Sequence, residues 1–128
     1  MEEYTDTVVE HFENPRNYGS MEDPDGVSQL GNISQGDFLK VFIRVKDNIV
    51  SDVKYLTRGS PACIACASMM TQLAIGKNLD DAMHIEAEDI VKALGGLPKE
   101  KLYCANRGAI GLQEAIINHV YGARAQRD

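Results

Sequence analysis

The stretch Gly59-Ser60-Pro61-Ala62-Cys63-Ile64-Ala65-Cys66-Ala67-Ser68 lies where the sequence changes from a strand pattern to a helix pattern. Ser60 is a good helix N-cap, because its hydroxyl can accept a hydrogen bond from a backbone N–H that has no partner within the helix. Pro61 suits the first helical position, where the N–H that proline lacks would be unpaired. The stretch therefore predicts a helix that begins at Pro61 and carries Cys63 and Cys66 one turn apart on one face.

The segment before this stretch has the pattern of a small antiparallel sheet. Apolar residues occupy every second position from Leu39 to Val45, which is the period of a half-buried strand. Lys46-Asp47-Asn48 can form a tight reversal into a partner strand from Ile49 to Thr57. A weaker strand pattern covers Val27 to Ile33. These segments predict three strands.

Helical patterns lie at the N-terminus and after the strands. We expect helices over residues 6–13, capped by Thr5 or Asp6, and over 61–75, 79–83, 85–94 and about 99–120. Gly108 and Gly111 fall inside the last helix, where each costs about 1 kcal/mol relative to alanine. Close helix packing or a weakened helix start would account for them. Strands followed by helices predict an α+β domain with helices packed on one face of a three-stranded antiparallel sheet.

Length and composition limit the classes of protein that fit. The 128 residues are 44% hydrophobic, which predicts one domain spanning 1–128. The formal net charge of -6 argues against partners such as nucleic acid or an anionic membrane surface. No stretch approaches the roughly 18 apolar residues of a membrane span, and we expect a cytoplasmic protein. Thiols stay reduced there, so the three cysteines are expected to be metal ligands, reactive thiols or core residues rather than disulfides.

Cysteine chemistry is the main functional signal in the residues themselves. Cys63, Cys66 and the distant Cys104 offer three soft thiolates, and Asp37, Asp52 or His84 could complete a set for zinc or an iron–sulfur cluster. The alternative is that Cys63 and Cys66 are small buried hydrophobes, because their neighbours are uniformly small and apolar. The three histidines are expected at the surface or at its boundary: His11, His84 and His119.

Several blocks, in order, carry a resemblance to a known family. They are Tyr4 to Asp6, Val8 to Asn17 with its His-Phe-Glu-Asn-Pro-Arg-Asn run, Gly36-Asp37, Gly59 to Thr71, Gly76 to Ala82, Leu94 to Pro98, Lys101 to Cys104 and Ala115-Ile116. Together they resemble the iron–sulfur cluster scaffold family of IscU and the NifU N-terminal domain. The resemblance implies an α+β scaffold that is not an enzyme in the turnover sense. Such a scaffold receives sulfur from a cysteine desulfurase, assembles a [2Fe–2S] cluster and passes it to acceptor proteins with chaperone help.

The ligand positions depart from the family pattern. The resemblance implies cysteines before Gly-Asp and after the glycine of the central block, and a His-Cys pair near the last helix. Those positions hold Gln35, Ser60, Tyr103 and Cys104 here, so only Cys104 and Asp37 remain of the family's set. The family's chaperone-docking Leu-Pro-Pro-Val-Lys is replaced by Leu97-Pro98-Lys99-Glu100-Lys101, which weighs against chaperone docking.

A relocated site would replace the thiol that is missing at Ser60. Cys63 is one helical turn beyond Ser60, so Asp37, Cys63 and Cys104 can form a three-ligand site for iron or a cluster, with Cys66 as a fourth member. This hypothesis requires the Cys63 and Cys104 sulfurs to lie close together. Two alternatives remain open: a degenerate scaffold that acts as a binding or regulatory module without a cluster, and a zinc-binding or persulfide-accepting thiol protein. Both a monomer and a homodimer that shares ligands are compatible with the sequence.

Overall fold

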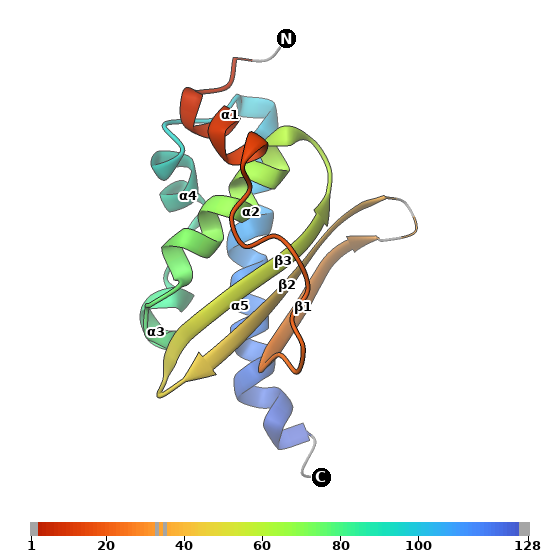
Figure 1. Cartoon of the computed structure of the whole chain (residues 1–128), viewed down its shortest axis with the longest axis vertical. Coiled ribbons are helices and arrows are strands. Elements are labelled where there is room, and N and C mark those ends of the chain that lie inside the picture. The colour runs from red at the N-terminus through yellow and green to blue at the C-terminus, as the bar shows by residue number, and fades with distance from the viewer. Residues whose placement is uncertain (1–2, 33, 35, 126–128) are drawn as a thin grey trace.

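Three antiparallel strands form one sheet in the order β1-β2-β3 in the computed structural model, which describes residues 3–32, 34 and 36–125 (Figure 1). The strands are β1 (Gly26–Asn32), β2 (Asp37–Lys46) and β3 (Ile49–Arg58). All three were predicted; the expected end of the first, Ile33, lies outside the described residues. The turn between β2 and β3 places Asp47 and Asn48 at positive φ, 53° and 65°, as a two-residue hairpin loop requires.

The helices are α1 (Asp6–Glu13), α2 (Pro61–Ala74), α3 (Leu79–Met83), α4 (Ala87–Ala93) and α5 (Leu102–Ala125), with a 3-10 turn, η2, at Lys99–Lys101. Helix α5 packs on β1 and β2, and α2 packs on β3. In Figure 1 α5 runs behind the sheet and α2 lies alongside β3, while α1 covers one end of α2 and α4 packs on α5. The predicted α+β architecture with helices on one face is confirmed.

The core lies between the sheet and helices α2 and α5. Alternation in β2 buries Leu39, Val41 and Ile43 against these helices. In α2, 10 of the 14 residues are buried, which explains why this helix lacks a polar face. The N-terminus of this helix lies at one end of the sheet, because Pro61 follows closely on the end of β3 at Arg58.

The two glycines of the last helix mark close packing, as expected. A Cβ added at Gly111 would lie 3.0 Å from the Val41 side chain and 3.1 Å from the Leu39 side chain. A Cβ at Gly108 would lie 3.3 Å from the Ile90 side chain. The start of the predicted helix is also weakened, because residues 99–101 form a 3-10 turn before α5.

The surface assignment of His11 is wrong. Its side chain is 3% exposed and its Nδ1 lies 2.8 Å from Ser68 Oγ in α2. The apolar face of α1 packs on α2 and carries His11 into the interior, where the Ser68 hydroxyl satisfies it. His84 is exposed and His119 is half-buried, in agreement with the prediction. No helix within the described ranges is long and apolar enough to cross a membrane.

Candidate functional site

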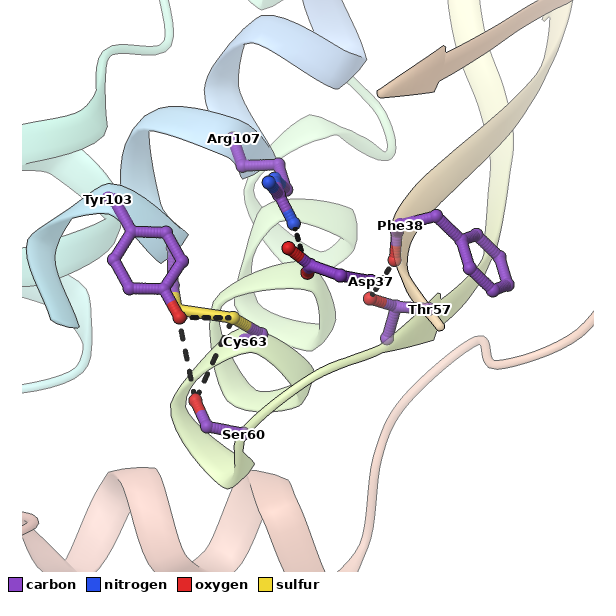
Figure 2. The surroundings of a disulfide bond; sticks show 8 residues. Asp37, Phe38, Thr57, Ser60, Cys63, Tyr103 and Arg107 are labelled. Carbon is purple, nitrogen blue, oxygen red and sulfur yellow. Dashed lines mark hydrogen bonds and ion pairs between the residues drawn. A yellow bond between two sulfur atoms is a disulfide. The ribbon is translucent and has the colours of Figure 1, made fainter. Parts of the chain in front are cut away.

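Cys63 and Cys104 meet at the starts of two helices and are joined as a disulfide (Figure 2). Cys63 is the third residue of α2 and Cys104 is the third residue of α5. Their Cα atoms are 4.8 Å apart, although 41 positions separate them in the sequence. The disulfide corrects the expectation that all cysteines are reduced. The two sulfurs lie close together, which is what the hypothesis of a relocated ligand site requires.

Ser60 lies beside both sulfurs. Its Oγ is 3.7 Å from Cys63 Sγ and 4.0 Å from Cys104 Sγ. The backbone of Ser60 has the extended conformation of an N-cap residue, but its side chain makes no capping hydrogen bond. The predicted capping role of the hydroxyl is therefore wrong. The hydroxyl is directed at the sulfur pair instead, where it can donate a hydrogen bond to a thiolate.

Tyr103 and Arg107 form the solvent side of the site. The Tyr103 hydroxyl is 3.9 Å from Cys63 Sγ, and 47% of Tyr103 is exposed. The Arg107 guanidinium lies 5.9 Å from the centre of the Tyr103 ring. Both residues belong to the first two turns of α5, so the helix that supplies Cys104 also supplies its polar surroundings.

Asp37 points to Arg107. Its Oδ1 accepts a hydrogen bond from Arg107 Nη1 at 2.7 Å, and its carboxylate is exposed. Asp37 is the first residue of β2, and the Thr57 hydroxyl fixes this end of the sheet by donating to the Phe38 carbonyl oxygen at 2.7 Å (Figure 2). The ion pair engages the carboxylate that the relocated site would use as a ligand. Sequence reasoning missed Arg107, because 70 residues separate the two partners and no local pattern connects them.

Cys66 is a core residue. It is fully buried, and burial raises the pKa of its thiol to about 12. Its backbone packs near Gly108 of α5. A thiol in this environment stays protonated and is a poor metal ligand. Cys66 therefore fits the alternative of a small buried hydrophobe.

The expected ligands do not form a preassembled metal site. Among the described residues, no three side chains of the types His, Cys, Asp and Glu lie close enough together to hold a metal ion. Asp37 is paired with Arg107, Cys66 is buried, and Gln35 lies outside the described residues. The structure brings together Cys63 and Cys104, flanked by the hydroxyl groups of Ser60 and Tyr103. This cysteine pair can exchange between a dithiol and a disulfide.

Comparison with known proteins identifies the family. The family model of the NifU-like N-terminal domain matches residues 3–127. The chain belongs to the NifU-like N-terminal domain family. The iron–sulfur cluster assembly scaffold protein IscU 1 of Archaeoglobus fulgidus is 46% identical to it over 116 residues, which cover 91% of this chain and 76% of the relative. The family membership confirms the resemblance found in the sequence.

Two further relatives agree with this assignment. The scaffold protein IscU of Aquifex aeolicus is 39% identical over 120 residues, covering 92% of this chain and 76% of the relative. The nitrogen fixation protein NifU of Azotobacter chroococcum is 36% identical over 121 residues, which cover 93% of this chain but only 39% of NifU. This NifU-like domain therefore corresponds to one part of the longer NifU protein.

Solved structures share the fold. The N-terminal region of a NifU-like protein from Brucella abortus has a TM-score of 0.56 at 19% identity and covers 95% of this chain and 89% of its own. A protein of Fervidobacterium islandicum AW-1, for which a scaffold role in the SUF system is suggested, has a TM-score of 0.70 at 20% identity and covers 88% of this chain and 96% of its own. At these identities the likeness concerns the fold alone.

Proposed function

We propose that this chain is a scaffold in iron–sulfur cluster assembly and that its reduced Cys63 and Cys104 thiolates bind iron or a [2Fe–2S] cluster as cargo. The observation that carries the proposal is the contact between the two sulfurs at the helix starts, in a family whose relatives are named as such scaffolds. The sulfur comes from a cysteine desulfurase, and the product goes to iron–sulfur acceptor proteins. Iron binding requires the thiol form of the pair, which reducing conditions such as those of a cytoplasm favour.

The donor set fits iron better than it fits a complete cluster. Two thiolates can hold one iron, whereas clusters of this kind usually have four cysteine ligands. Asp37 is the third ligand of the proposed set, and its carboxylate must leave Arg107 to take part. Otherwise the remaining ligands come from cargo sulfide or from a second copy of the chain. The hydroxyls of Ser60 and Tyr103 serve as hydrogen-bond donors to the thiolates rather than as ligands.

Anaerobic reconstitution tests this function. The protein is reduced, freed of reductant and incubated with ferrous iron and sulfide, and bound iron and acid-labile sulfide are then determined. We expect stoichiometric iron and sulfide in the wild type and in Cys66→Ala, and their loss in Cys63→Ser and Cys104→Ser. The same protein kept in its disulfide form should bind neither, because a disulfide offers no thiolate.

The absence of a third close donor among the described residues favours one alternative, a scaffold-shaped binding module that carries no cluster. Anaerobic reconstitution with iron and sulfide distinguishes this binding module from a cluster scaffold. No bound iron in the reduced wild type would support the module and contradict cluster scaffolding. Zinc bound in preference to iron, and lost in Cys63→Ser and Cys104→Ser, would support a zinc-binding thiol protein instead.

A further inference from the structure

We propose that the Cys63–Cys104 pair itself reduces incoming sulfur to sulfide, by an internal thiol–disulfide step that leaves the disulfide on the protein. The inference rests on the proposed function, because it concerns the same site and its sulfur supply. The co-reactant is a persulfide, whose outer sulfur must gain two electrons before it can enter a cluster as sulfide. The two cysteines provide these electrons, and an external dithiol must then reduce the resulting disulfide before the pair can bind iron.

The first step loads Cys63. The Cys63 thiolate attacks the outer sulfur of the donor persulfide, the S–S bond of the donor breaks, and the donor leaves as a thiolate. Cys63 then carries a persulfide group. The second step unloads it. The Cys104 thiolate attacks Cys63 Sγ, the Cys63–Cys104 bond forms, and the outer sulfur leaves with its proton as hydrosulfide. The two protein sulfurs lose two electrons and the released sulfur gains them.

The surroundings of Cys63 favour it as the loading thiol. It is 6% exposed, whereas Cys104 is 2% exposed. Like Cys104, it lies in the first turn of a helix, where the backbone N–H groups favour a negative charge, so exposure and room for approach are what distinguish the two thiols. Gly59 adjoins Cys63 and is exposed. A side chain there would crowd the approach, since a Cβ at Gly59 would lie 3.3 Å from Cys63 Sγ.

The surroundings of Cys104 favour it as the resolving thiol. In the disulfide that the second step produces, the two Cα atoms lie 4.8 Å apart, within the range that a disulfide requires. Ser60 Oγ lies near both sulfurs and can donate to whichever of them carries the negative charge. Cys66 cannot replace Cys104, because it is fully buried and its thiol stays protonated.

The test measures released sulfide and the intact mass of the protein in the same reaction. Reduced protein, freed of reductant under anaerobic conditions, is mixed with one equivalent of glutathione persulfide. Free sulfide is assayed and the intact mass is measured after acid quenching. We expect the wild type to release about one sulfide per chain and to end as the Cys63–Cys104 disulfide. Cys104→Ser should keep the extra sulfur on Cys63 and release sulfide at least about tenfold more slowly. Cys66→Ala should behave as the wild type.

Two results would overturn the step: a wild type that keeps the extra sulfur, or Cys104→Ser releasing sulfide as fast as the wild type. Circular dichroism checks that the variants are folded, and disulfide mapping of the wild type provides a test that needs no variant. Iron binding by the same reduced protein is measured without persulfide. Iron binding without sulfide release contradicts this step alone, whereas sulfide release without iron binding contradicts the proposed function alone.

Discussion

Cys63 and Cys104 each occupy the third position of a helix, and their sulfurs meet although 41 positions separate them in the sequence. The meeting results from the packing of α2 on α5, in which small residues allow close approach. The pair therefore couples the oxidation state of the site to the stability of the fold. That coupling and four other properties of the structure can be tested.

Oxidation of the pair should stabilise the protein. Closing a loop of 41 residues lowers the entropy of the unfolded chain, which corresponds to about 4 kcal/mol on the chain-entropy model and to about 2–4 kcal/mol in typical measurements. Urea unfolding of the wild type with and without reductant measures the difference. Cys104→Ser should unfold at the same urea concentration in both conditions. Equal midpoints for the oxidised and reduced wild type would contradict the expectation.

His11 should make the protein sensitive to acid. Burial lowers the pKa of His11 below its ordinary value of 6.5; the positive charge of Arg16 adds to this effect, and Glu10 opposes it. The unfolded chain therefore takes up the proton first as the pH falls. The stabilising contribution is complete above pH 6.5 and is lost as the pH falls towards the lower pKa of the folded state.

The slope of the free energy of unfolding against pH measures this effect. We expect a loss of up to about 1.4 kcal/mol per pH unit below the ordinary histidine pKa, and its disappearance in His11→Gln. His84→Gln is the matched control on an exposed histidine. The pKa of His84 is raised by its hydrogen bond to the Asp80 carbonyl oxygen, so its contribution has the opposite sign. The same slope in His11→Gln as in the wild type would show that His11 is not the group responsible.

Gly111 and Gly122 should respond in opposite ways to alanine. A Cβ at Gly111 would lie 3.0 Å from the Val41 side chain, whereas a Cβ at Gly122 meets nothing within 4 Å. We expect Gly111→Ala to destabilise the protein by about 1–2 kcal/mol, because overpacking outweighs the gain in helix propensity. Gly122→Ala should stabilise it by up to about 1 kcal/mol. The urea midpoints of Gly111→Ala and Gly122→Ala measure these changes in stability. If both substitutions stabilised the protein, the close packing of α5 on β2 would be contradicted.

Arg107 should restrain Asp37. The ion pair is exposed on the Asp37 side, so its strength is below about 1 kcal/mol. If Asp37 is an iron ligand, Arg107→Gln should raise the affinity for ferrous iron by about 2–5-fold, because the carboxylate is released. Asp37→Asn should abolish that gain in the double variant. An unchanged affinity in Arg107→Gln would exclude Asp37 from the ligand set.

Local patterns were sufficient to predict the elements of the fold. Pro61 marked the start of α2 because its fixed φ and missing N–H suit the first helical position. The alternation from Leu39 marked β2, since only one face of the sheet is covered by helices. Both features depend on neighbouring residues alone, which is why the sequence reveals them.

The site depends on packing between distant segments, so the sequence predicted it only in part. The resemblance to a family and the one-turn spacing from Ser60 pointed to Cys63 and Cys104. Nothing in the local sequence showed that Arg107 would engage Asp37. The small apolar neighbours of Cys66 gave its burial as one alternative, and Cys66 is indeed buried. The burial of His11 was also missed, because its partner Ser68 lies 57 residues away.

Iron K-edge X-ray absorption of the reduced protein, loaded with ferrous iron and no sulfide, tests the central claim most directly. Without added sulfide, any sulfur bound to the iron must come from the protein. We predict two sulfur neighbours at about 2.3 Å, the usual length of a metal–thiolate bond, and one in Cys63→Ser or Cys104→Ser. Iron surrounded only by oxygen and nitrogen in the wild type would contradict the account.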